Sequence, residues 1–188
     1  MDIVLFLGCL FIFISYFIGS WPVGRSMAKF FDDVEVGEAG SGKHGATNVI
    51  RTTHDRMLGA VVFLVDAGFK GTIWMSAMYI IFGAIFHTYS WIVYACFAAV
   101  LLGHVYPALT LFKTGGAGIA ILIGGPAILV PGLAYALGLA AWLGVFHFSH
   151  GIKFICNIAS VSTLLLIGLL SACSLNFPGR FCSLLFLP

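Results

Sequence analysis

The residues best suited to chemistry lie in a glycine-rich stretch, GEAGSGKHGATNVIR, which runs from Gly37 to Arg51 between two apolar segments. Its glycines allow backbone N–H groups to converge on an anion, and a helix predicted to begin near Ala46 adds the positive end of its dipole. Hydroxyl, amide and guanidinium donors follow at close spacing. The stretch predicts a phosphate-binding loop formed by Gly40, Ser41, Gly42, Thr47, Asn48 and Arg51. A flexible, solvated loop with a helix cap is the alternative.

The same stretch nearly matches the nucleotide-binding P-loop, G-x-x-x-x-G-K-[ST], but His44 stands where a hydroxyl should hold magnesium. A P-loop also needs a preceding strand within a βαβ unit, and residues 34–36 are the only candidate strand nearby. ATP hydrolysis is therefore disfavoured.

A second polar group lies further along the chain, in GHVYP from Gly103 and FKTGGAG from Phe112. A histidine near a helix end, a lysine and a glycine turn repeat the anion-binding pattern at His104, Lys113, Gly115 and Gly116. Between the two groups, Asp66 and Lys70 form an i,i+4 pair within an apolar run. Charges at such depth either face a cavity or form a mutual salt bridge, and both readings stay open.

These residues must be positioned by membrane helices, because the chain is 61% hydrophobic with only nine basic and seven acidic residues. Charge-free runs cover residues 3–24, 71–112, 114–152 and 154–179, and one crossing needs about 20 residues. The run 71–112 should hold two crossings. Residues 57–69 either continue through Asp66 and Lys70 as one interrupted helix or form a half-helix. We predict an all-α polytopic membrane protein, one domain over residues 1–188, with six to seven transmembrane helices, several short or interrupted, and a glycine-rich cytoplasmic loop at 25–56.

Charge distribution sets the expected orientation and excludes some partners. Five of the nine basic residues fall in loop 25–56, which predicts a cytoplasmic loop and an external N terminus. The first apolar run has no basic flank and no A-x-A site, so it is expected to be an uncleaved helix. A net charge of +2 without a basic patch argues against nucleic acid. The five cysteines lie mostly in apolar runs without a C-x-x-C pair, so no metal site is expected.

Together these segments resemble the acyl-phosphate-dependent glycerol-3-phosphate acyltransferases of bacteria, the PlsY family, over roughly residues 12–165. The matching residues are SYFIGS from Ser15 with Pro22 and Gly24, the loop from Gly40 to Arg51, Asp66 with Lys70 and Gly71, GHVYP from Gly103, Phe112 with Lys113, and, as a third motif, IASV from Ile158.

The resemblance implies that a fatty acyl group passes from a long-chain acyl phosphate to the 1-hydroxyl of glycerol 3-phosphate. The products are lysophosphatidic acid and phosphate, in the first step of phospholipid synthesis at the bacterial inner membrane. No cofactor or metal is implied, and we expect a monomer. No catalytic triad, H-x-x-x-x-D pair or reactive cysteine is apparent, so direct transfer is expected. We assign His104, Lys113 and Ser41 to catalysis and phosphate binding to Gly40, Gly42, Thr47, Asn48, Arg51, Lys70, Gly115 and Gly116.

The sequence departs from the family pattern at three places. The second glycine turn usually reads F-K-G-G-K-G, whereas Ala117 occupies the position of the second lysine here. Lys43 stands where the family usually has asparagine, and Asp66 to Lys70 is one residue longer than D-x-x-K-G. Two alternatives therefore stay open: a catalytically impaired member that binds lipid precursors or partners, and a small membrane transporter, which should spread charges over several helices.

Overall fold

The computed structural model describes residues 2–125, which lie within one compact unit of the chain. These residues form helices joined by turns, and no strand occurs among them. Residues 34–36, the candidate strand, lie in a loop. The all-α prediction is confirmed for this part of the chain, whereas the prediction of a single domain over residues 1–188 stays a prediction.

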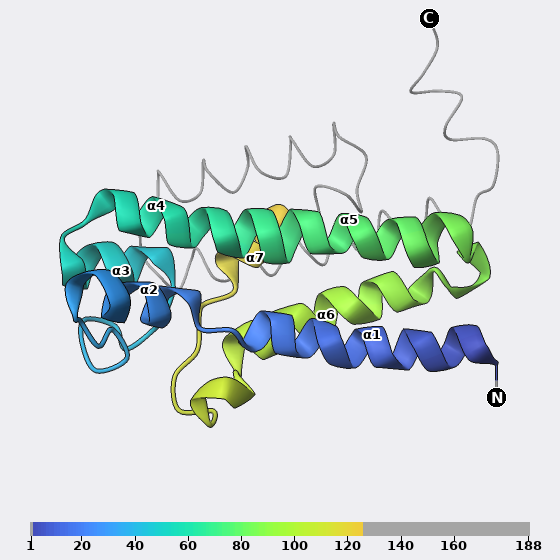
Figure 1. Cartoon of the computed structure of the whole chain (residues 1–188), viewed down its shortest axis with the longest axis horizontal. Coiled ribbons are helices and arrows are strands. Elements are labelled where there is room, and N and C mark those ends of the chain that lie inside the picture. The colour runs from blue at the N-terminus through green and yellow to red at the C-terminus, as the bar shows by residue number, and fades with distance from the viewer. Residues whose placement is uncertain (1, 126–188) are drawn as a thin grey trace, which may run out of the picture. The chain divides into compact units, whose positions relative to one another are not determined.

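Two parallel helices, α1 (Ile3–Ser20) and α6 (Trp91–Val105), pack side by side at their glycines (Figure 1). A Cβ atom on Gly19 would lie 2.1 Å from the carbonyl oxygen of Val100, and one on Gly103 would lie 2.1 Å from that of Tyr16. Only glycine allows backbones to approach this closely, as in other tightly packed membrane helices.

Replacing Gly103 by alanine is expected to destabilise the protein by about 1–3 kcal/mol, because the added methyl group meets backbone that cannot rotate away. Thermal unfolding in detergent would measure the loss. Ala98→Ser, at an exposed position of the same helix, is the matched control and should unfold like the parent. Equal transition temperatures for Gly103→Ala and the parent would contradict the close packing.

A long helix runs antiparallel to both and spans residues Arg56–Ile85 (Figure 1). It consists of α4 (Arg56–Leu64), the π-helix η1 (Val65–Ile73), α5 (Trp74–Met78) and a second π-helix, η2 (Tyr79–Ile85). It begins where the Asp55 carboxylate accepts the N–H groups of Met57 and Leu58, at 2.7 and 3.1 Å. The interrupted-helix reading of residues 57–69 is thus confirmed.

The prediction of two crossings within residues 71–112 is wrong in its boundaries. Residues 71–85 complete the helix that begins at Arg56, and the 3₁₀ turn η3 (His87–Tyr89) then leads into α6, so the run holds half of one helix and all of another. The helix passes through Asp66 and Lys70 without ending because the two charges neutralise each other (2.8 Å).

Three helical stretches among residues 2–125 are long and apolar enough to cross a membrane: Ile3–Asp32, Arg56–Ile85 and Trp91–Thr110. The first bends at Trp21 and Pro22, because a proline imposes extended backbone on the residue before it. The further crossings expected after residue 125, and the motif beginning at Ile158, lie outside the described residues. The total of six to seven helices therefore stays a prediction.

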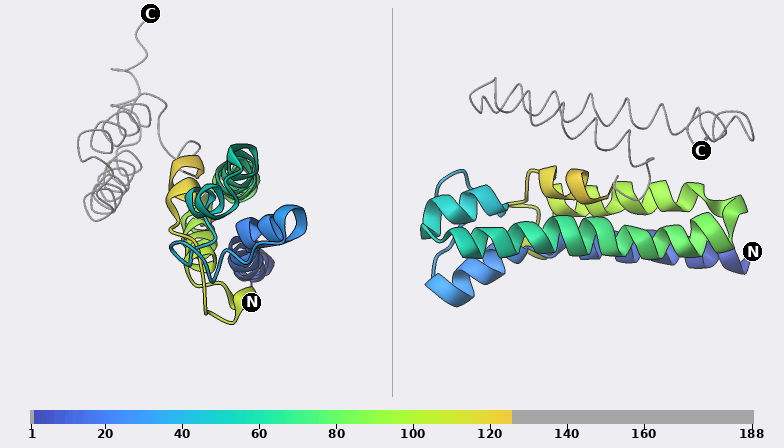
Figure 2. Two further views of the ribbon diagram at one scale, coloured as in Figure 1. Left: turned by 90° about the vertical axis from the view of Figure 1, so that its left-hand side faces the viewer. Right: turned by 90° about the horizontal axis from the view of Figure 1, so that it is seen from above.

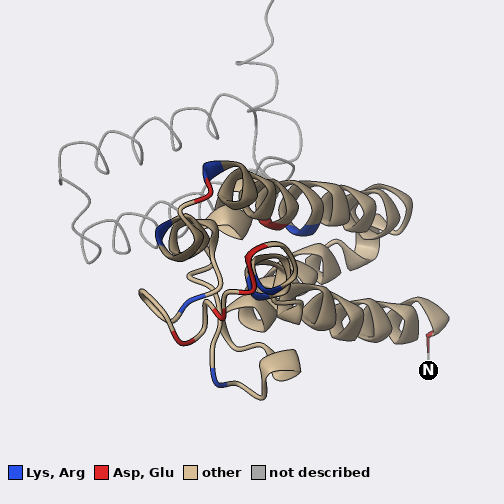
Figure 3. Ribbon diagram, turned by 60° about the vertical axis from the view of Figure 1, so that its left-hand side comes forward, with Lys and Arg blue, Asp and Glu red and all other residues tan. Residues whose placement is uncertain are grey.

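The glycine-rich loop is held by a small apolar core at one end of the bundle. This core joins α2 (Val23–Asp32), the loop, α3 (Ala46–Thr53) and α4 through Val23, Ala28, Val36, Val49, Leu58 and Val62. Most of the charged residues also gather towards this end, away from the N terminus (Figure 3). The loop is thus packed in place, which disfavours the alternative of a flexible, solvated loop.

The second glycine-rich segment follows α6. After the 3₁₀ turn η4 (Ala108–Thr110) the chain leads into α7 (Ile119–Gly124), which packs against η1 (Figure 2). A Cβ atom on Gly124 would lie 1.9 Å from the carbonyl oxygen of Ala67, and the Thr72 hydroxyl donates to the Gly124 carbonyl at 3.1 Å.

Candidate active site

Asn48 organises the first loop from inside. Its side-chain amide is buried and donates to the carbonyl groups of Val36, Ala39 and Lys43 at 2.9–3.0 Å, while its oxygen accepts the N–H of Ser41 at 2.7 Å. Both ends of the amide are therefore engaged within the loop. Sequence reasoning assigned Asn48 to phosphate, whereas the structure gives it the role of shaping the loop.

Two glycines of this loop have backbone conformations that favour glycine. Gly40 and Gly42 have φ of 61° and 69°, and a Cβ atom on Gly40 would lie 2.3 Å from the Asn48 side-chain oxygen. Around these turns the side chains of Ser41, Thr47 and Arg51 are exposed. No residue between 2 and 125 engages those three side chains in a hydrogen bond or ion pair, so their donors can reach a ligand.

Asn48→Ala is expected to open the loop, because one partly buried N–H and three carbonyl groups, one of them in a buried hydrogen bond, would lose their partner. Limited proteolysis should cut residues 33–45 at least about tenfold faster, since one unmet buried group alone costs about 1–3 kcal/mol. Thr47→Ala is the control, because its exposed side chain supports no loop contact. An unchanged cleavage rate in Asn48→Ala would contradict this role.

The two glycine-rich segments, far apart in sequence, meet in the structure. The N–H of His44 donates to the Gly115 carbonyl at 3.2 Å, and the N–H of Gly116 donates to the His104 carbonyl at 2.8 Å. A Cβ atom on Gly24 would lie 1.9 Å from the His44 carbonyl oxygen, so the start of α2 also closes on this junction. The two segments that share the anion-binding pattern in the sequence thus lie at one place in the fold.

Beneath this junction the buried ion pair of Asp66 and Lys70 lies at the C-terminal end of α1. The Lys70 ammonium is fully buried, lies 2.8 Å from an Asp66 carboxylate oxygen, and donates to the carbonyls of Trp21 at 2.7 Å and Gly19 at 3.5 Å. Pro22 interrupts α1 and leaves its last carbonyl groups without intrahelical partners, and Lys70 supplies the missing donors. Both readings of this pair apply: the salt bridge is present, and Asp66 also lines a cavity.

Lys70 was assigned to phosphate binding, but its three donors are directed to Asp66, Trp21 and Gly19. The pair lies within the π-helix η1, which holds more residues per turn than an α-helix. This geometry accommodates the one residue by which Asp66 to Lys70 exceeds the D-x-x-K-G pattern.

A cavity of about 10 Å³, roughly the room for one water molecule, opens at this corner. Its lining includes Gly19, Ser20, Trp21, Pro22, Val23, His44, Asp66, His104, Pro107 and Gly116.

The buried His104 ring is held by its neighbours on two sides. Its Nδ1 lies 3.9 Å from an Asp66 oxygen, beyond direct hydrogen-bond distance, and a Cβ atom on Gly116 would lie 1.8 Å from its Nε2. Two of the four residues assigned from the second segment, His104 and Gly116, therefore meet at the cavity. Gly115 lies beside them, with its carbonyl bound to His44.

His44 is a cavity residue that the sequence did not single out as part of the site. Its side chain is 3% exposed, and neither ring nitrogen has a hydrogen-bond partner within residues 2–125. Burial, and then the charge of Arg25, lower the pKa of His44 below its usual value, so the ring is neutral at pH 7. Sequence reasoning used His44 only to argue against a P-loop, because burial is not visible in a loop sequence.

Arg25 and Glu35 form a bidentate ion pair beside the loop, at 2.7 Å and 3.0 Å. Both side chains are partly exposed. The sequence analysis did not predict this pair, because its partners stand ten residues apart with no helical spacing between them and meet only through the fold of the loop.

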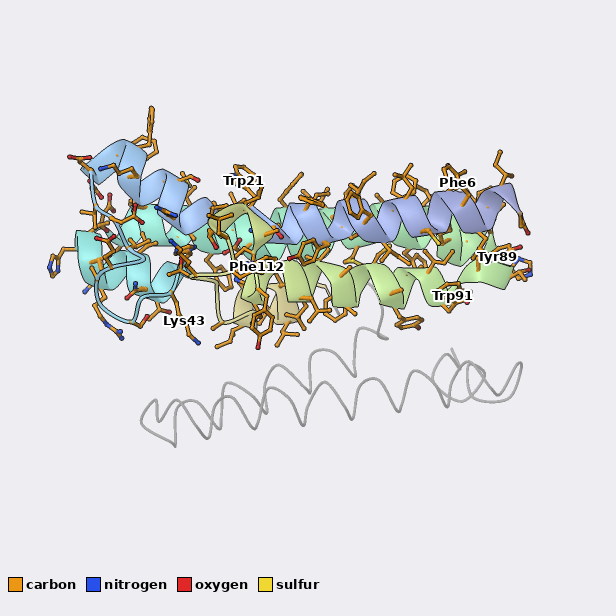
Figure 4. The ribbon with its side chains drawn as sticks, turned by 90° about the horizontal axis from the view of Figure 1, so that it is seen from below. Phe6, Trp21, Lys43, Tyr89, Trp91 and Phe112 are labelled. Atoms are coloured by element: carbon orange, nitrogen blue, oxygen red, sulfur yellow. The ribbon has the colours of Figure 1, made fainter. Side chains whose placement is uncertain are left out.

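The lysines of the two glycine turns lie away from the cavity. Lys113 is exposed and follows Leu111 and Phe112, which both have left-handed backbone conformations, with φ of 53° and 61°. Lys43 is exposed on the loop (Figure 4), and Ala117 is exposed as well. Neither Lys113, assigned to catalysis, nor Lys43 is among the cavity-lining residues.

Comparison with known proteins shows the family of this chain. The sequence model of the glycerol-3-phosphate acyltransferase family matches residues 9–187. Two relatives called glycerol-3-phosphate acyltransferase come from Prochlorococcus marinus (strain NATL1A) and Bordetella pertussis. They are 35% and 38% identical, over 95% and 74% of this chain and 82% and 61% of their own lengths.

Two solved structures are also similar to the chain. The crystal structure of PlsY (YgiH), an integral membrane glycerol 3-phosphate acyltransferase, in its glycerol 3-phosphate form has a TM-score of 0.72 at 28% identity, covering 86% of this chain and 76% of that one. The lysophosphatidic acid form has a TM-score of 0.69 at the same identity and coverage. These matches confirm the resemblance seen in the motifs. The chain is a membrane protein of the glycerol-3-phosphate acyltransferase family, an acyltransferase whose reaction acylates glycerol 3-phosphate.

Proposed function

We propose that this chain transfers a fatty acyl group from a long-chain acyl phosphate to the 1-hydroxyl of glycerol 3-phosphate, releasing lysophosphatidic acid and phosphate. The observation that carries the proposal is the junction at which His44 N–H meets the Gly115 carbonyl at 3.2 Å, above the buried Asp66–Lys70 pair. Both substrates carry phosphate groups, and this junction joins two glycine-rich turns with exposed donors beside a membrane helix bundle.

Direct transfer fits the residues of the site. The 1-hydroxyl oxygen forms a bond to the acyl carbonyl carbon, the bond between that carbon and the phosphate oxygen breaks, and the hydroxyl proton passes to the leaving phosphate. His104 is the protein's alternative proton acceptor, next to Asp66. Acyl phosphates are activated donors, so positioning and charge stabilisation supply much of the acceleration.

Exposed donors at the loop take the phosphate groups in this proposal. Arg51 offers a planar fork suited to phosphate, with Ser41 and Thr47 beside it. Lys113, which is exposed in the second glycine turn, is a further donor for these phosphate groups. Lys70 acts indirectly, by fixing the bend between α1 and α2 at which the cavity forms.

The membrane arrangement of the proposal follows from charge. We assign the loop 25–56 to the cytoplasm and the N terminus to the outside of the bacterial inner membrane, because basic residues concentrate in that loop. The aromatic side chains of Phe6, Trp21 and Trp91 are exposed on the helix surfaces, as expected of side chains that face lipid (Figure 4). We assign a single membrane domain and a monomer.

A catalytically impaired family member is the second candidate, and Ala117 is the observation that favours it. The second glycine turn offers no cation at this exposed position, so a phosphate group bound beside it would lack one stabilising charge.

Acyl transfer from palmitoyl phosphate to labelled glycerol 3-phosphate, with purified protein in detergent, separates the two candidates. Labelled lysophosphatidic acid from the parent, lost in Arg51→Ala and kept in Glu38→Gln, supports the enzyme. Product from Ala117→Lys alone supports the impaired member. No product from any folded variant contradicts the proposed transfer.

A further inference from the structure

His44 is a buried polar side chain of the first glycine-rich loop. It is 3% exposed, it lines the cavity together with Asp66 and His104, and no group within residues 2–125 forms a hydrogen bond with its ring. Leaving such a group without a hydrogen bond is unfavourable, so a ligand that supplies one gains binding free energy.

The neutral ring suits a ligand atom that both donates and accepts hydrogen bonds. Burial lowers the pKa of His44, so one ring nitrogen carries a proton and the other offers a lone pair at pH 7. A phosphate dianion only accepts, whereas a hydroxyl can do either. The imidazole therefore matches an alcohol group.

The charge and the volume of the cavity also favour an alcohol group over a phosphate group. Asp66 contributes a carboxylate to the lining, and Lys70 neutralises it from beneath (2.8 Å). Arg25 is likewise paired with Glu35. No unpaired Lys or Arg is among the cavity-lining residues. A phosphate group there would lie beside Asp66 without a free cation, and a cavity of about 10 Å³ admits a single oxygen-sized group.

We infer that His44 contacts the acceptor substrate: its imidazole forms a hydrogen bond with a hydroxyl group of glycerol 3-phosphate, while the phosphate of that molecule binds at the exposed loop donors. This inference rests on the proposed function for the identity of the acceptor. His44 thereby contributes to recognition of the glycerol part of the acceptor.

Three variants test the contact. His44→Leu removes both nitrogens, and His44→Gln restores one donor and one acceptor. Glu38→Gln, exposed in the same loop, is the matched control. Each is measured by thermal unfolding in detergent, alone, with glycerol 3-phosphate and with inorganic phosphate, which carries no carbon-bound hydroxyl.

We expect unliganded His44→Leu to unfold at or above the parent's transition temperature, because a buried unmet group has been removed. Its affinity for glycerol 3-phosphate, read from the shift in that temperature, should fall about tenfold, as for one lost hydrogen bond. Its response to inorganic phosphate should not change, and His44→Gln should recover most of the affinity.

In the acyl-transfer assay, the KM for glycerol 3-phosphate should rise about tenfold in His44→Leu, since about 1.4 kcal/mol is lost. The KM for palmitoyl phosphate should stay within about twofold of the parent. A large fall in the transition temperature of unliganded His44→Leu would show that the ring is a packing residue and would overturn the inference. Equal loss of the responses to glycerol 3-phosphate and phosphate, or no loss of either, would overturn it as well.

These outcomes separate the inference from the proposed function. If the parent yields no lysophosphatidic acid but its stabilisation by glycerol 3-phosphate is lost in His44→Leu, the contact stands and the proposed transfer fails. If the parent is active and His44→Leu behaves like it in both assays, the contact alone fails.

Discussion

Lys70→Met should reduce the free energy of unfolding by about 3–5 kcal/mol, the usual cost of removing one partner from a buried ion pair. The Asp66 carboxylate would stay in the interior without the ammonium that now lies 2.8 Å away, and the carbonyl of Trp21 would lose its 2.7 Å donor. Thermal or denaturant unfolding in detergent measures the change.

The double variant Asp66→Leu with Lys70→Met distinguishes charge from position. Replacing both charges by apolar groups is often neutral for stability, so most of the loss should be recovered. Acyl transfer should stay low, because the end of α1 would still lack its donor and the cavity would lose Asp66. Stability of Lys70→Met equal to the parent's would mean that the pair is not buried as described.

Gly116→Ala should reduce kcat about a hundredfold, with little change in the amount of folded protein. The new Cβ atom would lie 1.8 Å from Nε2 of His104, so the ring must leave its present place in the cavity wall. Displacing a group by about 1 Å at a reacting centre commonly costs this much in rate. Steady-state acyl transfer and thermal unfolding, measured together, give the two quantities.

Gly68→Ala is the matched control, because it adds the same methyl group within η1 where no atom of the described part of the chain lies within 4 Å of the new atom. Its kcat should equal the parent's. Full activity in Gly116→Ala would show that the position of the His104 ring does not matter to the reaction.

The amino-acid sequence alone was enough to predict the class of the protein and to indicate its candidate site. Hydrophobic runs without charge can be satisfied only by membrane helices, and two glycine-rich segments rich in donors stood apart from them. The predicted helix start at Ala46 is confirmed by α3. The same motifs indicated the family, because their order and spacing in this chain resemble the family pattern.

The tertiary structure decided what each polar residue does. The sequence predicts Asn48 and Lys70 as phosphate ligands, because both side chains carry hydrogen-bond donors. In the fold, those donors are directed to backbone carbonyls of the loop and of the end of α1. In the sequence, His44 is a departure from the P-loop pattern; in the structure it is a buried cavity residue whose ring has no hydrogen-bond partner among residues 2–125.

The reason is that a donor's partner depends on distance in space, whereas the sequence reports distance along the chain. The bend at Pro22 frees the carbonyls that Lys70 reaches, and the junction of Gly115 with His44 forms only when α2, α3 and α6 pack together. Burial of His44 follows from those contacts, so only the folded chain reveals it.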